Sequence, residues 1–75
     1  MKHDKIMDVL SENLGEGYHI VRGNGDLSPM IEWVDWVQQS DDADDIRVEV
    51  NFEDGTVQVF DKGVKLRQIW REDAV

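Results

Sequence analysis

The segment from Ile46 to Phe60 constrains the fold most strongly, because it predicts a β-hairpin. Apolar and polar residues alternate through its first half, which is the period-two pattern of a strand with one buried face. Asp54-Gly55 comes next, and this pair is typical of a two-residue type I′ turn between antiparallel strands. The chain then returns through a second apolar run. With the turn at this place, the expected pairs are Phe52 with Val57 and Val50 with Val59, all on one apolar face.

Residues 4–14 predict a helix. Ile6, Leu10 and Leu14 recur at four-residue spacing and form an apolar stripe on an otherwise polar segment. Asp4 is a suitable N-cap, and Gly15 lies where a left-handed residue would end the helix.

A second helix is expected over residues 29–39. Ser28-Pro29 is a helix-start pattern, with Ser as the N-cap and Pro at the first helical position. On a helical wheel the polar residues of this segment fall on one side and the apolar residues on the other. The segment is also rich in Trp, Ile and Val, which favour strands, so a strand is the alternative.

The rest of the chain predicts shorter elements. Residues 18–22 are typical of a strand, the glycine-containing segment 23–26 of a turn, and residues 64–70 of a last strand or of a short C-terminal helix. The expected fold class is therefore α+β, in a single domain over residues 1–75 whose last residues fray. A small antiparallel sheet of three to four strands, with the hairpin 46–60 at its centre, would pack against helices at about 4–14 and 29–39.

Charge is the most unusual feature of the composition. Eight Lys and Arg residues stand against 17 Asp and Glu residues, which gives a net charge of −9. Residues 1–45 hold three of the basic residues and 11 of the acidic ones, a net charge of −8. A field of this sign repels nucleic acids and anionic membranes and attracts basic surfaces. We therefore expect no direct binding to nucleic acid or membrane, although acidity can also serve solubility alone.

No residue pattern predicts a catalytic, cofactor or metal site, so we expect no enzyme activity. The chain has no cysteine, which favours a cytoplasmic protein, and no Gly-x-Ser-x-Gly motif. In the acidic loop 41–45, a calcium loop that starts at Asp41 would need Gly at position six and Glu at position twelve, where Ile46 and Phe52 stand. His3 and His19 lack zinc-ligand spacing, and Gly23-Asn24-Gly25 lacks the third glycine of a dinucleotide-binding turn.

The sequence favours a non-catalytic protein-binding module that acts as an inhibitor or adaptor on a basic surface. Tryptophan is enriched at binding hot spots, and we expect two of the three tryptophans in the core and one exposed as an anchor. The sharpest form of this hypothesis is a nucleic-acid mimic, of the kind that phages encode, that blocks a nucleic-acid-binding protein. The alternative is a structural subunit that dimerises through a Trp33/Trp36 face or the hairpin edge. The expected partner-binding residues are Glu32, Asp35, Trp36, Asp41, Asp42, Asp44 and Asp45.

Overall fold

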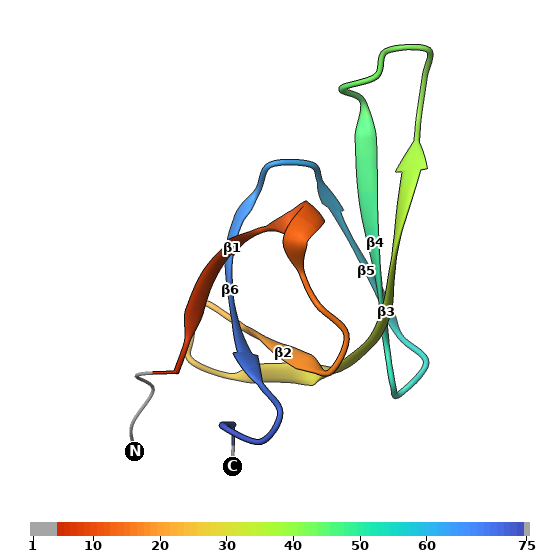
Figure 1. The fold of residues 1–75 in the computed structure, drawn as a ribbon. Helices are drawn as coiled ribbons and strands as arrows, with labels where there is room; N and C mark the ends of the chain where they lie inside the picture. Colours follow the sequence, from red (N-terminus) through yellow and green to blue (C-terminus); the bar gives the residue numbers. More distant parts are fainter. Residues whose placement is uncertain (1–4, 75) are drawn as a thin grey trace.

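The computed structural model describes residues 5–74, which form one curled antiparallel sheet of six strands (Figure 1). Along the sheet the strand order is β1-β6-β2-β3-β4-β5. The predicted N-cap Asp4, the residue His3 and Val75, which is the last residue of the predicted frayed end 71–75, lie outside the described residues. The elements are β1 (Met7–Leu10), the 3₁₀ turn η1 (Ser11–Asn13), β2 (Tyr18–Val21), β3 (Leu27–Gln38), β4 (Ile46–Phe52), β5 (Val57–Asp61) and β6 (Lys65–Trp70).

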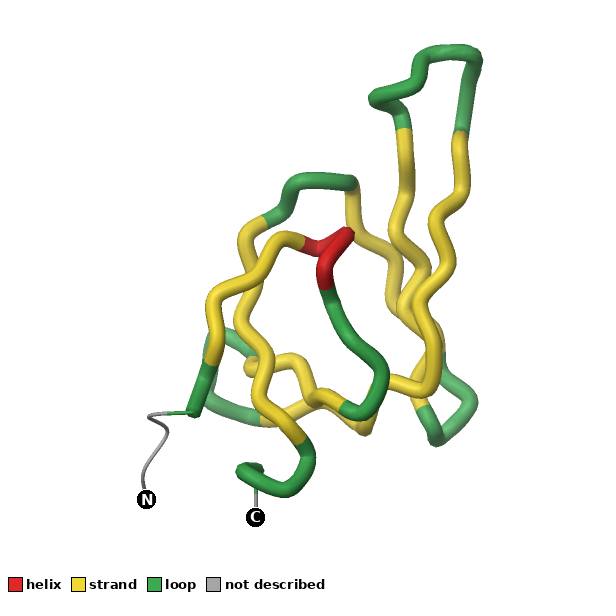
Figure 2. The backbone as a smooth tube through the Cα atoms, viewed as in Figure 1, coloured by secondary structure: helices red, strands yellow, loops and turns green. Residues whose placement is uncertain are grey.

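The α+β prediction is wrong, and its first helix is replaced by β1 and η1. Leu10 is exposed whereas Leu14 is buried, so the apolar stripe expected at four-residue spacing is not the face that packs. A helix of about ten residues is marginal by itself. Residues 7–10 instead gain a full ladder with β6. The helical part of the described chain is a three-residue turn (Figure 2), and no helix within residues 5–74 has the length and apolar character to cross a membrane.

The second predicted helix, residues 29–39, is also wrong, and the strand alternative is confirmed by β3. Two features of β3 disguise its period-two pattern. A bulge between Ile31 and Trp33 changes the phase, so Ile31 faces the core and Trp33 faces outward. Beyond the bulge both faces carry apolar residues, which imitates the wide apolar side of a helix.

Strand β3 joins the two halves of the sheet. Its first residues pair with β2, whereas its longer second part pairs with β4, from Ile31 opposite Phe52 to Gln38 opposite Ile46. Figures 1 and 2 show that β3 bends between these parts and then runs with β4 away from the other strands. The bulge lies where the pairing changes from β2 to β4, and bulges increase the local bend and twist of a strand.

The hairpin over residues 46–60 is confirmed as β4 and β5, but its predicted register is wrong by one residue. The N–H of Gly55 donates to the Phe52 carbonyl, and the N–H of Phe52 donates to the Thr56 carbonyl. The loop therefore has three residues and ends in Gly55, whose φ is 89°, instead of being a two-residue type I′ turn. The resulting pairs are Asn51 with Val57, Val50 with Gln58, and Val48 with Phe60.

The other strand predictions hold. Strand β2 occupies the predicted segment 18–22, a turn follows it, and β6 is a strand rather than the alternative helix. The main core is formed by residues from the N-terminal half and from β4. Ile31, Val48 and Val50 are fully buried at its centre. The members of this core are Leu14, Ile20, Ile31, Val48, Val50 and Phe52.

Turn η1 connects the first edge of the curled sheet to the β5–β6 turn. Ser11, which is fully buried, donates its hydroxyl to the Asp61 carbonyl at 2.6 Å and accepts the N–H of Val64 at 3.3 Å. Next to it, Glu12 Oε1 accepts the N–H of Gly63 at 2.8 Å. Hydrogen bonds from the backbone of Glu12 and from Gly63 lower the pKa of the Glu12 carboxyl. These contacts hold η1 against the turn that follows β5, the last strand along the sheet.

Candidate partner-binding surface

An arm formed by residues 32–49 projects from the rest of the molecule (Figures 1 and 2). It consists of the second part of β3, the loop 39–45 and the first part of β4. With 12 residues, β3 is the longest strand, and the molecule measures 45 × 23 × 18 Å. Because the arm contains strands on both sides of its loop, hydrogen bonds between β3 and β4 hold it extended.

The two faces of the arm carry different side chains. Opposite residues of an antiparallel pair share a face, so Trp36 lies on the core-side face with the fully buried Val48. Trp33 and Asp35 lie on the outer face, where the Trp33 Nε1–H donates to Asp35 at 3.1 Å. Trp36 is nevertheless 58% exposed and Trp33 45% exposed. Both indoles are therefore accessible to a partner from opposite sides of the arm.

The prediction that two of the three tryptophans belong to the core is therefore wrong. Trp70 is the one that is half-buried, and its ring packs edge-to-face on Tyr18 with the centroids 5.0 Å apart. The structure also contains no joint Trp33/Trp36 face, because these two residues lie on opposite faces of the arm. A dimer interface on one face of the arm would therefore contain Trp33 or Trp36 but not both.

The tip of the arm is an acidic loop with a defined backbone. Asp42 accepts the N–H of Asp44 through Oδ1 at 2.9 Å and the N–H of Asp45 through its carbonyl at 3.0 Å. The N–H of Gln39 closes the loop by donating to the Asp45 carbonyl at 2.9 Å. Asp41, Asp42 and Asp44 are exposed and Asp45 is half-buried. The carboxylates of the tip thus sit on a backbone that its own hydrogen bonds hold in place.

The arm carboxylates have no basic neighbour along their own segment. Residues 32–45 contain six acidic residues and no Lys or Arg. Within residues 5–74 the one ion pair closer than 4 Å joins Arg47 on β4 to Asp61 on β5, at 2.8 Å. Arg47, the basic residue of the arm, is thus engaged toward β5. The negative charge of the arm is therefore left for solvent, ions or a partner to balance.

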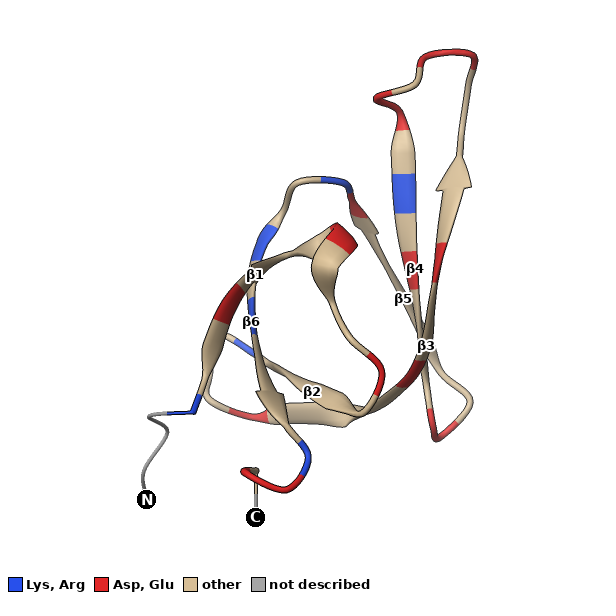
Figure 3. Ribbon diagram, in the orientation of Figure 1, with Lys and Arg blue, Asp and Glu red and all other residues tan. Residues whose placement is uncertain are grey.

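Positive charge collects on β6 and on the turns at its ends, which meet the arm where the N–H of Lys62 donates to the Ile46 carbonyl. Residues 62–71 contain four basic residues and no acidic one, namely Lys62, Lys65, Arg67 and Arg71. Figure 3 shows them on β6 and on the turns at its two ends, while the tip of the arm is acidic. The molecule is therefore electrically polarised as well as acidic overall.

The structure brings together only part of the predicted partner-binding set. Asp41, Asp42, Asp44 and Asp45 share the tip. Glu32 lies at the bulge where the arm begins, roughly 20 Å from the end of β3 at about 3.3 Å per residue. Asp35 and Trp36 lie on opposite faces between these places. Sequence reasoning named Trp33 only in the dimer alternative and not among the partner-binding residues. Its position two residues before Asp35, on the same face of a strand, was the signal that could have added it.

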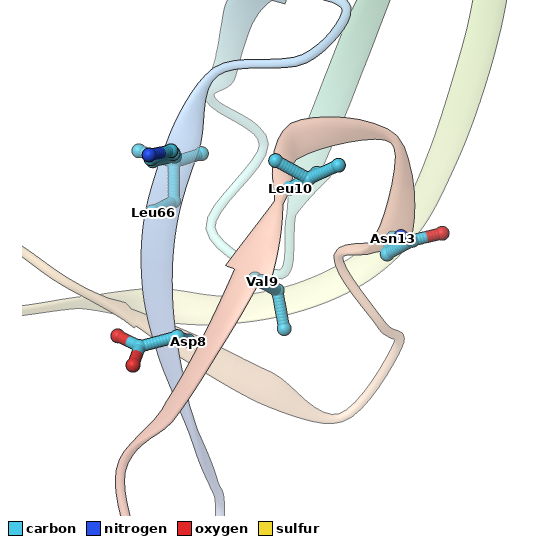
Figure 4. Close-up of a pocket in the computed structure, with 6 residues that line it drawn as sticks. Asp8, Val9, Leu10, Asn13 and Leu66 are labelled. Atoms are coloured by element: carbon cyan, nitrogen blue, oxygen red, sulfur yellow. The ribbon is translucent and has the colours of Figure 1, made fainter.

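A hollow of about 650 Å³ lies between β1, η1 and β6, away from the arm (Figure 4). Its lining combines aliphatic side chains with one carboxylate and one amine, and it has no Ser, Cys or His that could act as a nucleophile or base. Nor do residues 5–74 contain a group of three or more His, Cys, Asp or Glu side chains that could hold a metal ion. The lining residues are Asp8, Val9, Leu10, Asn13, Lys65 and Leu66.

The residues, charges and geometry of this chain carry any functional inference, because no family model, no curated protein and no solved structure matches it.

Proposed function

We propose that this protein is a non-catalytic, acidic binding module that docks through its arm onto a basic protein surface, as a small inhibitor or adaptor. The observation that carries the proposal is the projecting arm, with six acidic residues and no basic one between residues 32 and 45. Complementary charge accelerates encounter and selects partners of the opposite sign. The absence of cysteine supports a cytoplasmic setting for this function.

An exposed indole can supply binding free energy that charge alone does not. Electrostatic steering changes association rates more than affinity, whereas buried aromatic anchors dominate binding free energy. Trp36 is the more exposed of the two arm tryptophans, and it precedes the acidic loop by only a few residues. We infer that the acidic tip orients the partner and that Trp36 anchors it.

The nucleic-acid mimic is the narrower form of this proposal. Exposed carboxylates on a hydrogen-bonded loop can occupy a basic groove that otherwise binds phosphates. The extended two-stranded arm, with three exposed Asp residues at its tip, has the slender shape that such a groove admits. In this form the partner is a nucleic-acid-binding protein, and nucleic acid competes with the arm for the same groove.

Affinity capture with matched charge variants tests the proposal. The arm variant carries Asp41→Asn, Asp42→Asn, Asp44→Asn and Asp45→Asn. The control variant carries Asp8→Asn, Glu16→Gln, Glu72→Gln and Asp73→Asn, which removes the same number of carboxylates from exposed positions away from the arm. A basic protein captured from host lysate at physiological salt should be retained by the wild type and by the control, and lost by the arm variant and by Trp36→Ala.

Competition decides between the two forms. Release of the captured protein by added DNA supports the mimic, and retention in the presence of DNA restricts the function to a general inhibitor or adaptor. Equal retention by the arm variant and the control would show that the arm is not the docking surface, and would overturn the proposal.

A further inference from the structure

Strand β5 lies at an open edge of the sheet. It is the last strand in the order β1-β6-β2-β3-β4-β5, and it pairs with β4 on one side. An edge strand presents a row of backbone N–H and C=O groups that can pair with a further strand. This edge lies on β5 itself and is separate from the acidic tip of the arm.

The ladder between β4 and β5 shows which groups are free. At its two ends the N–H of Phe52 donates to the Thr56 carbonyl, and the N–H of Lys62 donates to the Ile46 carbonyl. Hydrogen-bonded pairs alternate along an antiparallel ladder, so Gln58 and Phe60 also direct their backbone groups to β4. Val57, Val59 and Asp61 direct theirs away from β4, and the Ser11 hydroxyl donates to the Asp61 carbonyl. Val57 and Val59 are left with outward backbone groups.

Most protections of an edge strand are missing from the centre of β5. Such strands generally carry Lys, Pro, inward charges or a bulge that prevent pairing with another molecule. The charged residue of β5 is Asp61 at its end, which is ion-paired with Arg47, whereas residues 57–60 contain no charged residue and no Pro, and the ladder to β4 runs without a register shift. Val57 is 53% exposed and Val59 49% exposed. The opposite edge strand, β1, carries Asp8 in only four residues.

We propose that β5 pairs with β5 of a second copy of this chain, antiparallel and centred on Gln58. The Asp61 carbonyl already accepts a hydrogen bond from Ser11. The pairing between the two copies therefore uses the outward backbone groups of Val57 and Val59. In this register each Val57 lies opposite Val59 of the second copy, and four backbone hydrogen bonds form. The four valine side chains then meet on the outer face, since opposite residues share a face. A two-fold interface of this kind is self-complementary.

Charge complementarity at the ends supports the same register. With Gln58 opposite Gln58, the end of β5 that is followed by Lys62 lies beside the turn of the other copy that contains Asp54, and the symmetry repeats this arrangement. The Asp54 carboxyl accepts hydrogen bonds from Thr56, which lower its pKa and hold it as the charged form at the turn. The pairing leaves the arm tip of each copy free, so the dimer would present two acidic arms to its partners. Two linked sites raise apparent affinity through effective concentration.

The predicted dimer is weak and has a distinctive dependence on salt. Two short edge strands bury little surface, which is typical of transient association. Each copy carries a charge of −9, so the copies repel one another at low ionic strength. Screening should therefore strengthen this association, whereas it weakens docking of the arm on a basic partner.

Sedimentation equilibrium from micromolar to millimolar protein tests the proposal. The wild type should approach twice the mass of one chain at high concentration, and more readily at high salt. Val59→Lys should remain monomeric, because it places a charge in the centre of the interface at an exposed position. Met7→Lys makes the same kind of change on the opposite edge, at a residue that is 45% exposed, and should dimerise like the wild type.

Amide hydrogen exchange locates the interface in the unmodified protein. The N–H groups of Val57 and Val59 should exchange quickly in dilute solution and at least several-fold more slowly at millimolar concentration. The N–H of Gln58, which is directed to β4, should be protected at both. A wild type that stays monomeric, loss of dimer in Met7→Lys rather than in Val59→Lys, or exchange at Val57 and Val59 that is independent of concentration would each overturn the proposal. None of these results depends on the function of the arm.

Discussion

At the residue scale, Ser11 shows how one small polar side chain can determine the end of an element. A fully buried hydroxyl must be hydrogen-bonded, and Ser11 both donates to the Asp61 carbonyl and accepts the N–H of Val64. These partners are about 50 residues away in the sequence. A residue that seemed to belong inside a polar helix face is therefore a cross-link between distant strands.

Ser11→Ala should lower the free energy of unfolding by about 1–3 kcal/mol, because it leaves two buried backbone groups without this partner. Urea denaturation at neutral pH measures the change. Ser40→Ala is the matched control, since Ser40 also accepts a backbone N–H but lies in the exposed loop of the arm. The control should stay within about 0.5 kcal/mol of the wild type. Similar losses in both variants would show that burial of Ser11 is not what matters.

At the element scale, strands fixed by local pattern were predictable and those fixed by distant contacts were not. β4, β5, β2 and β6 each have a simple apolar alternation or a bounding turn in the sequence. β1 gains its ladder from β6, more than 50 residues later in the chain, and no local pattern reports such pairing. In β3 the bulge and the two-sided apolar arm removed the period-two signal. The acidic tip could be found in the sequence as a run of Asp residues. That Trp33 and Trp36 lie on opposite faces could be concluded only from the pairing of β3 with β4.

The turn between β4 and β5 allows a direct test of the backbone conformation at Gly55. Gly55 has a φ of 89°, which an L-residue adopts at a cost of about 1–2 kcal/mol, and a Cβ added there would meet no other atom within 4 Å. Gly55→Ala should therefore destabilise the protein by about that amount through conformation alone, as measured by urea denaturation. Gly23→Ala also adds a Cβ in open space but without a positive φ, so it should be neutral or stabilising by up to about 1 kcal/mol. Equal effects would contradict the left-handed conformation of Gly55.

At the scale of the whole molecule, the segregation of charge works against stability. The first 45 residues were expected to concentrate the negative charge. The structure gathers six of their carboxylates on one arm, whereas Lys65, Arg67 and Arg71 lie on β6 and on the turn after it. Like charges held close together raise the free energy of the folded state. A surface arranged for stability alone would intersperse the two signs. This arrangement is expected if the acidic residues of the arm serve a partner and lower the stability of the folded state.

This cost can be measured with the arm variant that carries Asp→Asn at positions 41, 42, 44 and 45. It changes the net charge from −9 to −5, and the side-chain oxygen of Asn can still accept the hydrogen bond that Asp42 accepts. At low salt the free energy of unfolding should rise by roughly 0.5–1 kcal/mol, because repulsion between neighbouring carboxylates is removed. The gain should vanish near 1 M salt, where the Debye length is about 3 Å. The control variant at positions 8, 16, 72 and 73 has the same net charge and should gain less. Equal gains would assign the repulsion to net charge rather than to the arm, and would remove the argument that the arm is kept acidic against stability.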